Sequence, residues 1–277
     1  MSALSTRKAR NGIVAAAAAV ALLAIPIGIA LPAQAAPPET AVAKYVALGD
    51  SIAAGQGAGI PLDACLRTGA GYANGLDAIP RINLLRNAGC SGASIADVAA
   101  GQLGQVNRGT TLVTITAGAG DLDIGGVYAA CFPDPAVPAC VAAVVAAQQT
   151  LESGVIGERL TALLIATHER SPRAQILVTG YPLPFGGATQ GFLGVIDQAV
   201  AALDAQIAGA VAAAAGLGGV PAGYVDVTAA FAGHSAVSAD PWLGSNPADP
   251  VTFLHPNAAG YAAYTGIVHD AYLAVAP

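Results

Sequence analysis

Short apolar segments alternate with longer, alanine-rich segments over most of the chain. The short segments are rich in β-branched residues, and several are apolar at nearly every position, as in parallel strands that are buried on both faces. The longer segments have the length and composition of helices. We therefore predict strands at residues 44–48, 82–85, 112–115, 176–179 and 224–227, and helices at 94–103, 137–168, 191–216 and 257–275.

This alternation of strand and helix predicts a three-layer α/β/α sandwich around a parallel sheet of about five strands. Gly154 and Gly157 predict a break within the helical stretch 137–168. The dipeptide Ser171-Pro172 ends the second of these helices, because a residue before proline disfavours the α region. No internal repeat, charge run or interdomain linker interrupts the pattern, so we expect a single domain.

The start of the chain has the three parts of a secretory signal peptide. Three basic residues are followed by an apolar run over residues 13–31, and Ala33 and Ala35 then form an A-x-A exit. An uncleaved transmembrane anchor is the alternative, because the run is about long enough to span a bilayer. The exit favours cleavage, so we predict a signal peptide at residues 1–35 and one domain over 36–277.

The net charge of the chain limits the kinds of molecule that it can bind as partners. The chain has 11 Lys and Arg against 17 Asp and Glu, and removal of the three basic residues of the signal leaves 8 − 17 = −9. This balance excludes nucleic acid as a partner. No later apolar run is long enough to cross a bilayer, because the alanine-rich stretch 195–220 carries Asp197, Gln198, Asp204 and Gln206. We expect an exported, acidic, soluble protein without a stable membrane span.

All four cysteines follow the predicted signal, and an oxidising destination favours disulfides. Four cysteines allow three pairings. Closure of the short Cys131–Cys140 loop is the simplest and leaves Cys65 with Cys90. Zinc is the alternative, but no Cys-x-x-Cys or Cys/His spacing supports it. We expect no metal.

Ser51 follows the first predicted strand in a tight strand-to-helix turn, directly after Gly49 and Asp50. In sheets of this kind, ligands bind at the loops that follow the carboxyl ends of the strands. The turn exposes the hydroxyl and directs backbone N–H groups at its surroundings. An ordinary helix N-cap is the alternative role for this serine. As a nucleophile, Ser51 needs a base.

Of the four histidines, His255 is the best placed to be that base. His168 lies at a predicted helix end, His269 lies on the last predicted helix beside Asp270, and His234 lies in a loop rich in small residues. His255 directly precedes the last helix, where a loop can carry it over the edge of the sheet.

Two motifs at opposite ends of the domain carry a family resemblance. Gly49-Asp50-Ser51 after the first strand and His255-Pro256-Asn257 before the last helix resemble the SGNH hydrolases, the GDSL lipase/esterase family. Residues 87–94 look like the second block of that family, whose glycine donates a backbone N–H to the oxyanion hole; Gly92 matches it. Residues 113–121 look like the third block. The four blocks occur in the family's order and with its separations.

The resemblance implies a flavodoxin-like sheet and a serine esterase or lipase that uses no cofactor. Residues 176–182 are similar to a strand and turn of secreted actinobacterial members, which also pair cysteines at spacings close to Cys65–Cys90 and Cys131–Cys140. The α/β-hydrolase elbow does not fit, because residues 49–53 lack its final glycine. The glycine runs do not complete a phosphate-binding pattern.

The chain departs from the family at the oxyanion hole. Gly120 stands where the third block has an Asn, whose side chain would donate a hydrogen bond to the oxyanion. Loss of one such donor typically costs about 10²–10³ in rate. We expect the N–H groups of Ser51 and Gly92 to remain, with another backbone N–H or a water partly replacing the Asn. Asp50 and Asp121 are expected to brace their turns.

A second departure concerns the group that orients the histidine. Thr252 stands where the family usually has an Asp, three residues before the His. Such a group holds the imidazole in the right tautomer. Some secreted relatives use a main-chain carbonyl instead, so we expect the Thr252 carbonyl to orient His255, with Asp249 as the alternative.

These observations predict a secreted carboxylic ester hydrolase in which Ser51 attacks the ester carbonyl and His255 accepts its proton. A non-catalytic envelope protein with a binding role is one alternative, motivated by Gly120 and Thr252. An acyltransferase that uses the same Ser–His pair is the other. The substrate is a small-molecule or lipid ester, and the scarcity of aromatic residues favours small, soluble esters. The oligomeric state is not predicted.

Overall fold

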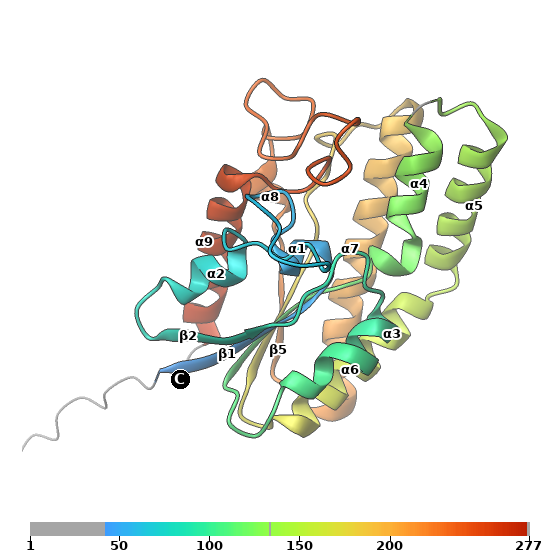
Figure 1. Ribbon diagram of the computed structural model, residues 1–277. Coiled ribbons are helices and arrows are strands. Elements are labelled where there is room, and N and C mark those ends of the chain that lie inside the picture. The colour runs from blue at the N-terminus through green and yellow to red at the C-terminus, as the bar shows by residue number, and fades with distance from the viewer. Residues whose placement is uncertain (1–41, 133, 276–277) are drawn as a thin grey trace, which may run out of the picture. The chain divides into compact units, whose positions relative to one another are not determined.

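A computed structural model describes residues 42–132 and 134–275 of the chain (Figure 1). The signal peptide predicted at residues 1–35 lies outside the described residues.

Five parallel strands form one sheet in the order β2-β1-β3-β4-β5. This is the flavodoxin-like order, and it confirms the predicted fold class. β1 lies between β2 and β3. Its pairing with β3 runs from Tyr45 opposite Leu112 to Gly49 opposite Thr116. The strands are β1 Ala43–Gly49, β2 Ile82–Asn87, β3 Leu112–Thr116, β4 Gln175–Thr179 and β5 Ala222–Val225.

Helices cover both faces of the sheet (Figure 1). One layer contains α1, α2 and α9, which pack on the strands and on each other; the other contains α3, α6 and α7, with α5 packed on α6 and α7. The helices are α1 Ser51–Ala54, α2 Tyr72–Asp77, α3 Ile95–Asp97, α4 Ile124–Cys131, α5 Pro138–Glu152, α6 Val155–Arg170, α7 Gly191–Gly218, α8 Thr228–Phe231 and α9 Ala258–Val275.

The predicted elements differ from the observed ones at a few places. The break within residues 137–168 occurs at Gly154, which adopts a positive φ of 74° before α6, whereas Gly157 lies inside α6. The predicted helix at 94–103 is instead a single turn of α3 that continues as a π-helical turn and a 3-10 turn as far as Gln105, and the observed stretch contains Gly101 and Gly104. The short helices α2 and α4 were not predicted, because their glycines obscure the helical pattern.

Buried tyrosine hydroxyls cross the interior of the sandwich and bond to threonines of the sheet. A buried hydroxyl needs a partner, and here the strands supply it. The bonds join Tyr45 to Thr114 (2.7 Å), Tyr72 to Thr116 (3.0 Å), Thr116 to Thr179 (2.7 Å) and Tyr264 to Thr179 (2.8 Å). These bonds fix α2 and α9 on β3 and β4 close to the carboxyl ends of the strands.

Helix α7 is long and apolar enough to span a membrane by length and composition alone, and so is the bent pair α5 and α6 taken together. In the structure α7 packs against α6, β4 and β5. Its buried Asp204 accepts the backbone N–H of Tyr181 at 2.9 Å, and its buried Asp197 accepts that of Phe185 at 2.9 Å. α7 is therefore part of one helical layer of the sandwich, and its two aspartates also hold the loop after β4.

Two disulfides join the same cysteine pairs that the sequence analysis favours. Cys65–Cys90 links the loop after α1 to the loop after β2, and Cys131–Cys140 links the end of α4 to the start of α5. No free cysteine is present among the described residues.

Candidate active site

One pocket at the carboxyl ends of the strands contains four of the predicted site residues: Ser51, Gly92, Gly120 and His255. They come from loops that follow three different strands and from the long segment before α9. The pocket has a volume of about 360 Å³, and apolar side chains form most of the rest of its wall. None of the described residues that line it is Lys or Arg. The site therefore suits a neutral, largely apolar ligand.

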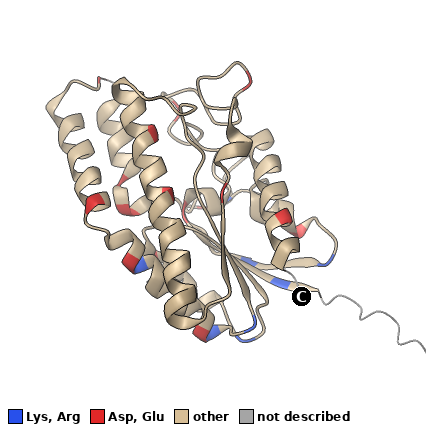
Figure 2. Cartoon of the chain, turned by 180° about the vertical axis from the view of Figure 1, so that it is seen from behind, with Lys and Arg blue, Asp and Glu red and all other residues tan. Residues whose placement is uncertain are grey.

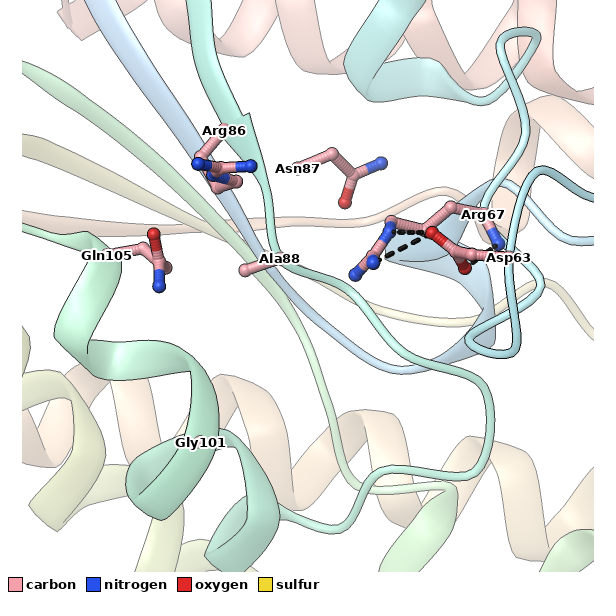
Figure 3. A pocket seen from close by; sticks show the side chains of 7 residues that line it. All are labelled: Asp63, Arg67, Arg86, Asn87, Ala88, Gly101 and Gln105. Atoms are coloured by element: carbon pink, nitrogen blue, oxygen red, sulfur yellow. Dashed lines mark hydrogen bonds and ion pairs between the residues drawn. The ribbon is translucent and has the colours of Figure 1, made fainter.

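A second hollow, of about 480 Å³, lies beside the end of β2 and has a different character (Figure 3). Its lining includes Asp63 and Arg67, which form an ion pair at 2.8 Å, and the exposed Arg86. No serine, threonine, cysteine or histidine is among its described lining residues, so it lacks a nucleophile and a base. The pocket that contains Ser51 is the candidate active site.

The basic residues lie away from the candidate site. Figure 2 shows the Lys and Arg segments mainly along the sheet and at its lower end, whereas the loops at the opposite end are uncharged or acidic. Attraction of an anionic substrate to the site is thus disfavoured.

The sharp turn that presents Ser51 depends on Gly49. This residue has a φ of 135°, and a Cβ at this position would lie 2.0 Å from the carbonyl oxygen of Thr116. β1 and β3 approach so closely here that the N–H of Asp50 donates to the same oxygen at 2.9 Å. The turn thus places Ser51 at the first position of α1, with its hydroxyl at the edge of the sheet.

Asp50 connects this turn to the loop after β3. Its buried carboxylate accepts the N–H of Ile52 at 3.0 Å, which caps α1, and the hydroxyl of Tyr181 at 2.5 Å. The same Tyr181 oxygen accepts the N–H of Ala119 at 3.2 Å. Burial raises the pKa of Asp50 to about 7, against the lowering effect of these hydrogen bonds. The expected bracing role of Asp50 is thus visible in its contacts.

Tyr181 is a residue of the site that the sequence motifs do not single out. It lies in the block 176–182, whose resemblance to family members was the only signal available. Its hydroxyl reaches across the carboxyl ends of the strands, a relation between β1, β3 and β4 that the sequence does not show.

Three backbone N–H groups in the pocket have no acceptor among the described residues: those of Ser51, Gly92 and Gly120. Unpaired backbone donors are uncommon in folded proteins, and they are what an oxyanion hole requires. Gly92 has a φ of 75° and open space around its Cα. The lining thus offers three main-chain donors where the family supplies two with an Asn side chain.

Gly120 has no room for a side chain. A Cβ at this position would lie 2.4 Å from the carbonyl oxygen of Ala93 and 2.8 Å from that of Gly92. The loop after β3 has closed onto the loop after β2. Asp121 stabilises this arrangement, since its carboxylate accepts the N–H of Ile95 at 2.7 Å and pairs with Arg159 at 3.0 Å.

The carbonyl that faces the ring of His255 belongs to Phe253, not to Thr252. The Phe253 oxygen lies 2.9 Å from Nδ1. The Thr252 oxygen instead accepts the main-chain N–H of His255 at 3.0 Å, within a tight turn, and forms no hydrogen bond with the ring among the described residues. The Asp249 carboxylate accepts the Thr252 hydroxyl at 2.7 Å and the N–H of Val251 at 3.1 Å, and it forms no hydrogen bond with the ring among the described residues. Leu254 has a φ of 59°, and this left-handed conformation rotates the Phe253 carbonyl toward the ring.

This contact determines which ring nitrogen is free. A carbonyl accepts only, so Nδ1 carries the proton and Nε2 keeps its lone pair. Burial lowers the pKa of His255 to about 4, while the bond to the Phe253 carbonyl acts in the opposite direction. The ring is therefore neutral at neutral pH and can accept a proton at Nε2.

The glycine run at residues 55–59 packs against this histidine. Gly57 has a φ of 99°, and a Cβ there would lie 2.7 Å from the Cβ of His255. The Gln56 side chain donates to the carbonyl of Val251 at 2.9 Å, which ties the loop after α1 to the histidine loop. The run does not complete a phosphate-binding pattern, and its contacts show that it supports His255.

The other histidines do not line this pocket, and no group of three or more His, Cys, Asp or Glu among the described residues could hold a metal ion.

Comparison with known proteins agrees with this geometry. The model of the GDSL-like Lipase/Acylhydrolase family matches residues 47–263. A lipase of Streptomyces rimosus is 33% identical over 254 residues, which cover 88% of this chain and 93% of the relative. The crystal structure of an extracellular lipase from Streptomyces rimosus superposes with a TM-score of 0.71 at 32% identity, over 83% of this chain and 99% of that one.

A phospholipase A1 from Streptomyces albidoflavus NA297 has a TM-score of 0.72 at 30% identity, over 83% of this chain and 99% of that one. The chain therefore belongs to the GDSL-like lipase/acylhydrolase family. It is an ester hydrolase of the lipase/esterase type, which argues against the non-catalytic alternative.

We predict that Gly120→Asn, which restores the side chain usual in the family, lowers kcat/KM for p-nitrophenyl butyrate by about 10²-fold instead of raising it. The added side chain would push the loop after β3 away from Gly92 and Ala93. Gly104→Asn is the matched control, since Gly104 has open space around it and lies outside the pocket. Higher activity in Gly120→Asn would contradict the close packing described here.

We also predict that the ring of His255 titrates near pH 4, below the ordinary value of 6.5, in NMR spectra assigned with a His255→Gln variant. Between these two values the unfolded chain binds the proton and the folded chain does not. The free energy of unfolding is therefore not reduced by His255 above pH 6.5, and it decreases as the pH falls from 6.5 toward 4. A ring that titrates at 6 or above would refute the burial argument.

Proposed function

We propose that the protein is a secreted serine esterase that forms an acyl-enzyme on Ser51, with His255 as general base and acid. The Ser51 Oγ attacks the ester carbonyl while Nε2 of His255 takes its proton. His255 then protonates the leaving alcohol and activates a water for deacylation. The developing oxyanion is stabilised by the N–H groups of Ser51, Gly92 and Gly120.

One observation carries this proposal: a serine, a histidine with a free Nε2 and three backbone N–H groups without acceptors line the same pocket. Each feature serves one requirement of acyl transfer. The Phe253 carbonyl takes the orienting role that an Asp has in a triad, and it stabilises the imidazolium through its dipole rather than through a full charge.

The walls of the pocket support a neutral ester with an apolar acyl group as substrate. Leu122, Ile124, Leu203 and Phe253 lie along it, and no described lining residue is a cation. Aromatic residues are few in the chain, and this scarcity favours small esters as substrates. Several of the aromatic residues nevertheless lie at this pocket. We therefore expect the acyl part of the substrate to make most of the apolar contacts.

We expect Ser51→Ala to lower kcat by about 10⁴-fold or more, because the nucleophile is lost. Ser91 offers a matched control, since it lines the same pocket but lies outside the proposed machinery. Ser91→Ala should keep its rate within about threefold and should still be labelled by a fluorophosphonate. Labelling of Ser51→Ala, or activity that persists in it, would refute the assignment. Transfer of the acyl group to an added alcohol in preference to water would favour the acyltransferase.

Secretion rests on three observations of different kinds: the basic and apolar start of the chain with its A-x-A exit, the two disulfides, and a related lipase that is extracellular. We expect the protein recovered from the medium of a producing actinobacterium to begin at Ala36, as measured by intact mass. A full-length chain that stays with the cells would instead support the uncleaved anchor.

A further inference from the structure

An aromatic cluster centred on Phe132 lies in the wall of the active-site pocket, at the end of α4 that is remote from Gly120. Its ring lies 4.6 Å from that of Phe253, 5.5 Å from Tyr128, 5.8 Å from Phe192 and 6.2 Å from Phe185. Four of the five phenylalanines of the chain thus meet at one place. Only Phe132, Tyr128 and Phe253 line the pocket; Phe185 and Phe192 stand behind them.

Helix α4 presents one face to this pocket. Ile124, Tyr128 and Phe132 are spaced by four residues and all line it. Asp123, whose side chain accepts the N–H of Gly126 at 3.2 Å, caps the start of the helix next to Gly120 and Leu122. α4 therefore runs from the oxyanion end of the pocket to its aromatic end.

The Cys131–Cys140 disulfide holds the far end of this helix. It joins the residue directly before Phe132 to the first turn of α5, with 4.6 Å between the two Cα atoms. A short helix of eight residues has little stability of its own. The disulfide and the aromatic contacts therefore hold the Phe132 ring at the end of the pocket.

Phe253 connects the two ends of the site. Its ring packs edge-on against Phe132, while its carbonyl accepts the Nδ1–H of His255. A substitution of Phe253 would thus disturb the base as well as the pocket wall. The ring partners of Phe132 among the described residues do not include His255, and its side chain has no polar atom, so its effect on substrate choice can be measured separately.

We propose that Phe132, held in place by the Cys131–Cys140 disulfide, sets the maximum length of acyl chain that the enzyme accepts. This inference rests on the proposed function, because it takes the apolar part of the pocket as the acyl site. A chain that extends from the ester carbonyl along α4 meets the Phe132 ring as a wall. The substrates are neutral esters of short or medium acyl chains, and longer chains are excluded by the ring.

The test compares kcat/KM over p-nitrophenyl esters from acetate to palmitate for the full mature protein and three variants. Phe132→Ala should move the optimum to acyl chains longer by at least two carbons, since each further buried methylene is worth about fourfold in kcat/KM. Phe132→Trp should move it to shorter chains. The rate on acetate should change little in both, because acetate does not reach the ring.

Phe192→Ala is the matched control. It removes the same ring from the same cluster, yet Phe192 does not line the pocket. It should lower the melting temperature without moving the optimum. An unchanged optimum in Phe132→Ala, in a protein that folds by circular dichroism and hydrolyses acetate, would overturn the proposal. An equal shift in Phe192→Ala would overturn it as well, since general loosening would then explain both.

The role of the disulfide is tested with C131A/C140A against C65A/C90A. Loss of the first pair should broaden the profile toward longer chains at an unchanged rate on acetate. Loss of the second pair, which lies beside Ser91 and Gly92, should lower all rates and leave the profile unchanged. Identical chain-length profiles in the two variants would show that the Cys131–Cys140 disulfide does not affect the choice of acyl chain. If fluorophosphonate labelling of Ser51 failed while Phe132→Ala still moved the optimum, only the proposed nucleophile would be wrong.

Discussion

The buried carboxylate of Asp50 is the constraint on which the site depends. Removing a carboxylate from water is costly, and it is tolerated only when hydrogen bonds replace the lost hydration. Here the N–H of Ile52 and the hydroxyl of Tyr181 do so, and each donor belongs to a part of the site. The first starts α1 immediately after Ser51, and the second reaches the loop that carries Gly120. Satisfying this one buried carboxyl group thus sets the relative positions of the turn after β1 and the loop after β3.

The loop that carries His255 is held in a comparable way by its own backbone. Thr252 closes a tight turn, Leu254 adopts a left-handed conformation, and the Phe253 carbonyl turns toward the imidazole. A neutral carbonyl orients the ring without adding a charge to the apolar pocket. Its cost is a smaller stabilisation of the imidazolium than a carboxylate would give. Because the same residue places its ring in the pocket wall, His255 and the apolar part of the pocket are both held by Phe253.

The absence of an Asn at position 120 is accommodated by closer packing. With no side chain, the loop after β3 approaches the carbonyls of Gly92 and Ala93, and the main-chain N–H of Gly120 remains without an acceptor in the pocket. A backbone donor in a rigid loop loses no side-chain entropy when it binds an oxyanion. The departure from the family at this position thus goes together with a local change in the backbone, which leaves a main-chain N–H in the pocket.

The sequence by itself determined the sheet, the turn at Ser51 and the segment of His255, because burial on two faces and tight turns leave marks within a few neighbouring residues. It did not determine which carbonyl faces His255, nor that the Tyr181 hydroxyl reaches Asp50. It also gave no sign that Phe132 lies in the wall of the pocket. These relations join residues far apart along the chain, and only the packing of the layers brings them together. Local pattern reports which face of an element is buried, whereas tertiary structure decides what that face contacts.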